Sequence, residues 1–406
     1  WAGAMGAAAC SDPERVGPVG PRGGHAAPHK GEKPQPQAPG SGAAAVSSGA
    51  RYWHDKMRIS AASQAIFDGA QRGDTRRVLT ALNAHGDPNC VNSAGYSALM
   101  LAVGGGYREV VALLLQASGD PNYALAGLSP LMIAAAAGQL EVARMLVNCG
   151  ASCVATDQEG RTALHRASER GHADLVKLLI QAGSSVDIGD WKGRTSLMLA
   201  AEAGHCDAVR ALLCAGANIS IADSGGDSAL TKCVNNGHED CLETMLKAGA
   251  PVNTGNRATG DTALAMAARV GSESMCRRLM QFQANVNLSN QKRETPLSLA
   301  AEGGHVKAAH LLLLAGADTT SQDLQGHTAL MRGAASGNAS VVSVLLDFGA
   351  NPSASSPVDS ASALTMAAAH GRTEAYSILI NGGAAVPAIE GGPEDTVLNS
   401  LRKPAG

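Results

Sequence analysis

A leucine recurs at nearly constant spacing through most of this 406-residue chain. Successive copies are 32 to 34 residues apart, and the series is Leu99, Leu131, Leu164, Leu197, Leu230, Leu264, Leu297, Leu330 and Leu364. A fixed period of this length is typical of a stack of similar units, each of which contacts only its neighbours. The period therefore overrides the two or three globular domains that the length alone would suggest.

The unit at residues 157–187 shows what each copy contains. Gly160 marks a tight turn that needs a positive φ, and Thr162 is placed to cap a short helix with its hydroxyl group. Gly171 is placed to end that helix, and a second helix is expected over residues 172–182. The apolar stripe of the second helix consists of Leu175, Val176, Leu178, Leu179 and Ile180. Two helices this short are marginal alone, so the unit needs copies on both sides to cover its apolar face.

Several residue types keep fixed places within the unit. They are Thr162, Ala163, Leu164, His165, Arg166, Ala167, Gly171, His172, Leu178, Leu179 and Gly183. The pattern resembles the ankyrin-repeat family, with nine recognisable repeats after a degenerate N-terminal cap. The closest match to the family's Thr-Pro-Leu-His motif is Thr295, Pro296, Leu297 and Ser298. We number these repeats one to nine by the nine leucines. The resemblance implies an all-α solenoid of stacked helix-turn-helix units with β-hairpin turns, over residues 61–388.

Departures from the repeat pattern fall in the turns. One residue is missing between repeats one and two, and one is added at residues 253–260 and again at 351–360. Arg293 in repeat seven and Ser360 in repeat nine stand where the family has glycine. Arg293 is expected to hold a positive φ at some cost or to change its turn.

The two ends of the chain lack the repeat. Residues 1–60 are rich in Gly, Ala and Pro and cannot bury enough apolar surface to offset the entropy of ordering, so we expect disorder there. Residues 389–406 are expected to form a flexible C-terminal tail.

Composition narrows the classes of function. The net charge is −3 and the basic residues are spread through the repeats, which argues against a nucleic-acid binder with a basic face. No run reaches the roughly 18 apolar residues of a membrane span. The nine cysteines are odd in number and mostly fall in expected helices, so we expect reduced thiols in the cytoplasm, with the nucleus or an organelle as alternatives. We expect a monomer.

Side chains capable of chemistry are kept apart by the same period. The recurring His172, His205, His238 and His305 would lie about 8–10 Å apart, whereas zinc needs bonds of about 2.0–2.1 Å. We expect their rings to bond neighbouring loop carbonyls instead. The chain has no nucleophile elbow, kinase signature or zinc-protease motif, and no nonrepeat segment that could house a catalytic domain. We predict no metal, no cofactor and no enzymatic activity.

The family resemblance implies a binding surface of a different kind. Ankyrin stacks are shaped like a cupped hand, in which hairpin tips and the exposed face of the first helices form a concave surface. The matching residues are Tyr96, Arg161, Arg166, Arg170, Trp191, Lys192, Arg194, Asp227, Asp261 and Glu294.

Charge divides these positions into two patches. Arg161 and Arg194, beside Trp191 and Lys192, predict a basic aromatic patch on repeats three and four, and the tip acids predict an acidic patch on repeats five to seven. Trp and Arg are enriched among binding hot spots, so the basic aromatic patch is the expected partner surface. In the alternative, structural interpretation, Trp191 simply folds over the neighbouring hairpin.

The function that follows is a noncatalytic scaffold or adaptor that binds a partner protein through the concave surface. One alternative is a regulatory or targeting module of a larger enzyme or channel, with Trp1 as a sign of truncation. Another is a structural component of a large assembly.

Overall fold

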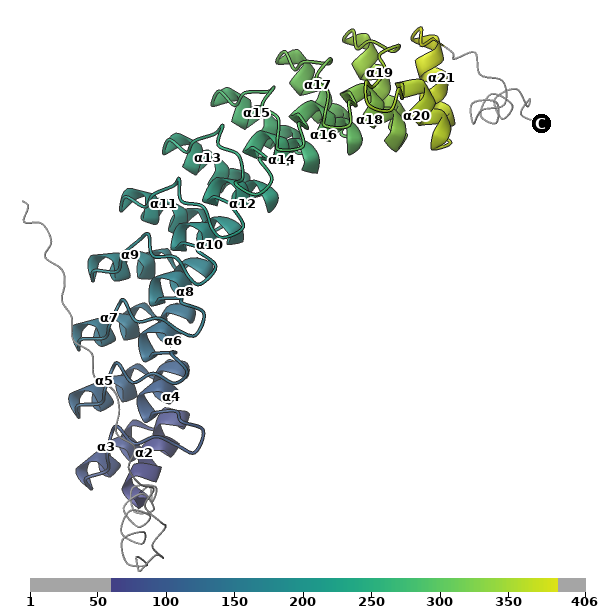
Figure 1. Cartoon of the computed structure of the whole chain (residues 1–406). Helices are drawn as coiled ribbons and strands as arrows, with labels where there is room; N and C mark the ends of the chain where they lie inside the picture. Colours follow the sequence, from purple (N-terminus) through teal and green to yellow (C-terminus); the bar gives the residue numbers. More distant parts are fainter. Residues whose placement is uncertain (1–59, 386–406) are drawn as a thin grey trace, which may run out of the picture. The chain divides into compact units, whose positions relative to one another are not determined.

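The computed structural model describes residues 60–385, and all the regular elements of this part are helices (Figure 1). The first helices of the units are α2 (Ala61–Arg72), α4 (Ala98–Gly104), α6 (Pro130–Ala136), α8 (Ala163–Glu169), α10 (Ser196–Ala203), α12 (Ala229–Asn235), α14 (Ala263–Val270), α16 (Pro296–Glu302), α18 (Ala329–Ser336) and α20 (Ala363–Ala369). The second helices are α3 (Thr75–Asn83), α5 (Arg108–Gln116), α7 (Leu140–Asn148), α9 (Ala173–Gln181), α11 (Cys206–Cys214), α13 (Glu239–Lys247), α15 (Glu273–Gln281), α17 (Val306–Leu314), α19 (Ala339–Asp347) and α21 (Thr373–Asn381). Apart from Ser60, the expected disordered segment lies outside the described residues, as does the expected tail.

The helices form two parallel rows. Each first helix packs against the first helix of the next unit, each second helix packs against its counterpart, and the two helices of one unit pack together (Figure 1). The nine recurring leucines lie at the centre of this packing, and none is more than 3% exposed. The period of the sequence is therefore the period of the core, and the predicted solenoid is confirmed.

Local signals in the best-formed unit act as the sequence predicts. Thr162 is the N-cap of α8, where its hydroxyl group accepts a hydrogen bond from the backbone N–H of His165. Gly160 and Gly171 have φ values of 76° and Gly183 has 91°, all in the left-handed region. The second helix, α9, begins at Ala173. Each of these positions joins two elements without a strained side chain.

The hairpins between the units are minimal. Residues pair across them in single antiparallel bridges, such as Gly189 with Thr195 and Ala222 with Ser228, and no extended strand forms among the described residues. Arg293 and Ser360 hold φ values of 60° and 57°, so the turns keep the conformation that glycine adopts elsewhere.

Three of the four recurring histidines contact a carbonyl of the preceding unit, as expected, and the ring of the fourth, His172, lies against Gly138. Nε2 of His205 lies 3.1 Å from the carbonyl oxygen of Glu169, Nε2 of His238 lies 3.0 Å from that of Glu202, and Nε2 of His305 lies 2.8 Å from that of Arg269. Asn338 takes this place in repeat eight and donates to the carbonyl of Glu302 at 2.9 Å. The series is structural.

One pair of cysteines contradicts the expectation of reduced thiols. Cys206 at the start of α11 and Cys241 in α13 form a disulfide, with their Cα atoms 4.8 Å apart. The two cysteines are 35 residues apart rather than 33, so they are not equivalent positions and the packing distance between equivalent residues does not separate them. The bond links repeats four and five on the second-helix row.

The helices of residues 60–385 are short. None of the helices there is both long and apolar enough to cross a bilayer.

Candidate protein-binding surface

The hairpin tips form a continuous edge held by single backbone hydrogen bonds. The N–H of Trp191 donates to Glu159 at 3.0 Å, Ser224 to Lys192 at 2.9 Å, Arg257 to Gly226 at 3.2 Å, Gln291 to Thr259 at 2.9 Å and Leu324 to Lys292 at 3.1 Å. Each tip therefore has a fixed position relative to the next, from repeat three to repeat eight.

An acidic or amide side chain begins most of these hairpins and organises the turn. Oδ1 of Asp157 accepts from the backbone N–H groups of Glu159 and Arg161, each at 2.9 Å. Asp190, Asp223, Asn290 and Asp323 make the same pair of bonds in later repeats.

Burial raises the pKa of the Asp157 carboxyl, but the backbone N–H of Arg161 and the guanidinium of Arg166 lower it by more. Its pKa therefore lies below the ordinary range, as do those of Asp190 and Asp323.

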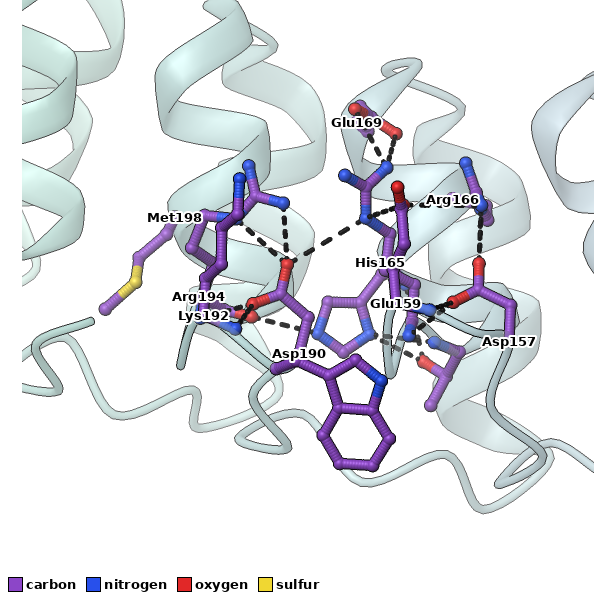
Figure 2. A network of polar contacts seen from close by, with 12 residues as sticks. Asp157, Glu159, His165, Arg166, Glu169, Asp190, Lys192, Arg194 and Met198 are labelled. Atoms are coloured by element: carbon purple, nitrogen blue, oxygen red, sulfur yellow. Dashed lines mark hydrogen bonds and ion pairs between the residues drawn. The ribbon is translucent and has the colours of Figure 1, made fainter. Parts of the chain in front are cut away.

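The predicted basic patch on repeats three and four is an internal ion-pair network (Figure 2). The guanidinium of Arg161 lies 3.0 Å from Glu159, 3.3 Å from Glu169 and 3.8 Å from Asp190. Arg194 forms two bonds with Asp190, at 2.9 and 2.7 Å. Their side chains are only 14% and 16% exposed, so the expectation of free basic tips was wrong for both arginines.

The two predicted site residues at the first helix of repeat three, Arg166 and Arg170, behave differently from each other. Arg166 is half-buried and pairs with the carboxylate of Asp157 (Figure 2). Arg170 is exposed, and no carboxylate among the described residues lies within ion-pair distance of it. Arg170 thus remains available on the face formed by the first helices.

His165 joins the same network from within the core. Its Nδ1 accepts from the backbone N–H of Thr162 at 3.1 Å, so its Nε2 carries the proton and donates to the carbonyl of Arg194 at 3.1 Å. Burial is the main reason that the pKa of His165 lies below its ordinary value. The neutral ring therefore connects repeat three to the hairpin of repeat four.

Trp191 is both exposed and fixed. It is 74% exposed, its indole Nε1 donates to the carbonyl of Gln158 at 2.9 Å, and its ring lies against Gly160. A Cβ added at Gly160 would come within 2.9 Å of the ring, so a residue without a side chain is needed there. The expected fold over the neighbouring hairpin is present, but most of the ring still faces solvent. Lys192 beside it is exposed.

Two of the three acids in the predicted acidic patch on repeats five to seven are buried, and the third, Asp227, is half-buried. Asp261 is 2% exposed and Glu294 is 7% exposed. The amide of Asn290 donates to both carboxylates at 2.8 Å, while Arg269 pairs with Asp261 and Arg332 pairs with Glu294, each at 2.9 Å. These two acids therefore present no negative surface, which corrects the sequence expectation.

Asp227 is held in the same way at the preceding hairpin. The amide of Asn256 donates to it at 2.5 Å, and the hydroxyl of Thr231 lies 3.3 Å away. The sequence analysis missed both asparagines, although they carry a signal. Asn256 and Asn290 stand where repeats three to five have Asp157, Asp190 and Asp223, and each follows a repeat whose tip residue is acidic.

A hollow of about 550 Å³ opens between repeats six and seven. Its lining includes Thr259, Asp261, Arg269, Lys292, Leu299 and Glu302. The hollow lies between the hairpin tips and the first helices α14 and α16, because residues of both line it. Tyr96, the remaining predicted site residue, is exposed on repeat one, away from this hollow.

Metal binding finds no support in residues 60–385. No group of three or more His, Cys, Asp or Glu side chains in that part of the chain could hold an ion.

Comparison with known proteins agrees with the repeat geometry. A family model described as "Ankyrin repeats (3 copies)" matches residues 66–157, 149–223, 230–323 and 312–389. The chain belongs to the ankyrin-repeat family, whose repeats are protein–protein interaction modules.

The human ASB11 ankyrin repeat domain is a similar solved structure. It shares 25% sequence identity with a TM-score of 0.51, over 56% of this chain and 100% of that domain. The fold is therefore the same over that stretch.

Curated relatives match shorter stretches. A probable E3 ubiquitin-protein ligase, XBOS32 of Oryza sativa subsp. japonica, is 32% identical over 31% of this chain and 26% of its own length. A putative ankyrin repeat-containing protein of Treponema pallidum (strain Nichols) is 35% identical over 23% of this chain and 32% of its own length. The chain thus spans about a third or less of the curated relatives it matches.

Proposed function

We propose that this chain is a noncatalytic adaptor or scaffold that binds a partner protein through the concave surface of its hairpin tips and first helices, with Trp191 as the central contact. The geometry of Trp191 carries the proposal. A tryptophan that is 74% exposed and also hydrogen-bonded through its indole N–H is already oriented before a partner arrives. Preorganised aromatic side chains lose little freedom on binding, which favours their use as hot spots.

The surroundings of Trp191 support the same surface. The backbone N–H of Trp191 donates to Glu159, and the network of Arg161, Arg194 and Asp190 lies beneath the two tips. The arginines therefore act as positioning residues for the hairpin that carries the ring. Lys192 and Arg170 supply exposed positive charge nearby.

Related proteins give a reason to keep one alternative. XBOS32 is named a probable E3 ubiquitin-protein ligase and matches this chain over only 26% of its length. The repeats could thus serve as the regulatory or targeting module of a larger enzyme. In either case the chain acts by binding, and we propose that it does so as a monomer in the cytoplasm. In that compartment, reductants would open the Cys206–Cys241 disulfide that the structure shows.

A crosslinking pull-down from the native cell lysate tests the proposal. It compares the wild-type chain with Trp191→Ala and with Leu314→Ala, a matched control that removes an exposed apolar side chain from the second-helix row. Loss of a hot-spot tryptophan weakens binding by about 30-fold or more. We expect a partner that Trp191→Ala loses and Leu314→Ala retains.

Arg161 and Arg194 are left intact in this experiment because their removal would disturb the fold rather than the surface. Equal capture by all three proteins would place the contact elsewhere and refute the role of Trp191. Circular dichroism spectra of the three proteins, which should coincide, serve as the folding control.

A further inference from the structure

Four basic residues on the hairpin tips have no acidic partner. They are Lys192, Arg257, Lys292 and Arg293, called the tip cations below. All four are exposed, and no carboxylate within residues 60–385 lies within ion-pair distance of any of them. By contrast, four basic residues of the first helices, Arg166, Lys232, Arg269 and Arg332, all form ion pairs, and Arg170 at the end of α8 forms none with a described residue.

The tip cations lie along one edge. Lys192 is on the tip of repeat four, Arg257 on that of repeat six, and Lys292 and Arg293 on that of repeat seven. Repeat five, between them, has Ser224 and Gly225 at its tip. Consecutive tips are joined by the backbone hydrogen bonds described above, and Gln291 also donates through its side chain to the carbonyl of Arg257 at 3.1 Å. The spacing between the charges is therefore fixed by the fold.

The acids of the same hairpins are withdrawn from this edge. Asp261 and Glu294 are buried and receive the amide of Asn290, and Asp227 receives that of Asn256. Glu302, an exposed acid on the face of the first helices, pairs with Arg332 at 2.6 Å. The chain has a net charge of −3, yet the fully exposed charges on the tips of repeats four to seven are all positive, and Asp227 is the one partly exposed acid there without a basic partner.

Exposed apolar side chains stand at both ends of the edge. Trp191 precedes Lys192, and Leu324, on the tip of repeat eight, is 62% exposed and donates through its N–H to the carbonyl of Lys292. With repeats about 10 Å apart, the four tips from repeat four to repeat seven cover about 30 Å. An extended peptide rises about 3.3 Å per residue, so about nine residues span this distance.

We propose that the hairpin edge of repeats four to seven binds an extended acidic segment of a partner protein, whose carboxylates face the tip cations. This inference rests on the proposed adaptor function and specifies the partner class. Opposite charge steers such a segment to the edge and sets its register. A nucleic acid fits less well, because the positive charge forms a single line bordered by the acids Glu159, Glu202 and Glu302 rather than a basic face.

The test uses a fluorescein-labelled nine-residue peptide of alternating Glu and Ala, and fluorescence anisotropy with the full chain. A peptide with Lys in place of Glu and a nine-nucleotide single-stranded DNA serve as probes of the other classes. The variant Arg257→Glu/Lys292→Glu is compared with Arg72→Glu/Arg76→Glu. The control pair is also exposed and outside ion-pair distance of any described acid, but it lies on the N-terminal cap, and both variants change the net charge equally.

We expect saturable binding of the acidic peptide that weakens as salt is added. The Arg257→Glu/Lys292→Glu variant should lose about tenfold or more in affinity, because two attractive pairs become repulsive, while the control variant stays within about twofold of wild type. Equal losses in both variants would mean a net-charge effect and would overturn the proposal. So would the absence of saturable peptide binding, or tighter binding of the DNA.

The two proposals can fail separately. A pull-down partner that is lost with Trp191→Ala but retained by Arg257→Glu/Lys292→Glu would leave the adaptor function standing and refute the acidic segment. A partner that is retained by Trp191→Ala but lost with Arg257→Glu/Lys292→Glu would leave the acidic segment standing and refute the role of Trp191.

Discussion

Replacing Asn290 with aspartate changes one atom group and tests how the buried acids of repeats six and seven are held. The side chain is 8% exposed, and its amide donates to Asp261 and Glu294 at 2.8 Å each. Its Oδ1 accepts from the backbone N–H groups of Lys292 and Glu294 at 2.9 Å each, and a carboxylate would keep these two bonds. Asn290→Asp therefore removes only the donor and places a third carboxylate beside two others.

The magnitude follows from the bonds that are lost. A hydrogen bond to a charged group contributes about 1.5–3 kcal/mol, so two of them amount to about 3–6 kcal/mol, to which like-charge repulsion adds. Arg269 and Arg332 lie against the same acids and offset part of the repulsion. We expect the free energy of unfolding to fall by about 3 kcal/mol or more at neutral pH, with the damage concentrated in repeats six and seven because the stack is held by nearest-neighbour contacts.

Urea titration followed by circular dichroism measures the loss, and Asn253→Asp is the matched control. Asn253 is exposed, its Oδ1 accepts from the N–H of Asn285 at 2.8 Å, and Asp187 makes the equivalent contact to Asn218 with a carboxylate. This control should cost less than about 1 kcal/mol. The loss in Asn290→Asp should shrink as the pH falls and protonation of the introduced carboxyl restores a donor. Equal midpoints for the two variants at neutral pH would refute the idea that the amide holds these acids together.

Three further predictions concern the stack as a whole. Leu179→Ala and Leu379→Ala remove equivalent, fully buried side chains, and each should lower the free energy of unfolding by about 2–5 kcal/mol. The central change should broaden the urea transition more, because Leu179 has a repeat on both sides. Equal broadening would contradict nearest-neighbour stacking. Reducing the Cys206–Cys241 disulfide opens a loop of 35 residues and should lower stability by about 3–4 kcal/mol, seen as a dithiothreitol-dependent fall in Tm that a Cys206→Ser/Cys241→Ser variant lacks. The pKa values of Asp157, Asp190 and Asp323 are lowered in the folded state, so the stability that these carboxylates contribute is complete at neutral pH. This stability is lost as the pH falls below about 4, where the carboxyls of the unfolded chain bind protons first. A Tm that is unchanged from neutral pH to about pH 3 would contradict this.

The features that repeat could be predicted from the sequence because each is tested nine times. Leu164 and its counterparts recur at one spacing, and a buried position is the only environment that explains such a series. Thr162 and Gly171 carry local signals, a cap and a left-handed residue, that depend on a few neighbouring atoms. Arg293 and Ser360 follow the same logic, since the chain around them forces the turn that glycine makes elsewhere.

The features that differ between repeats could not be predicted in the same way. The exposure of Arg161, Asp261 and Glu294 depends on side chains of the following repeat, which lie about 30 to 40 residues further along the chain. Arg194 differs, because its partner Asp190 lies four residues earlier in the same hairpin. A tip residue read within its own repeat looks solvated, whereas in the stack it meets Asp190, Asn290 or Arg332. The Cys206–Cys241 pair was missed because its two members occupy different places in their repeats.

The pairing across hairpins also restricts how this chain can evolve. Ankyrin genes that gain or lose whole repeats join hairpins that were not neighbours before. Loss of repeat seven would bring Asp261 of repeat six against Asp323 of repeat eight in place of Asn290, so that the two acids would depend on Arg332 as Glu294 and Asp323 do now. Duplication of repeat six would keep the match, because a second copy of Asn256 would follow Asp261. The order of the repeats therefore affects the stability of the stack, and we expect the two rearrangements to differ in their free energy of unfolding.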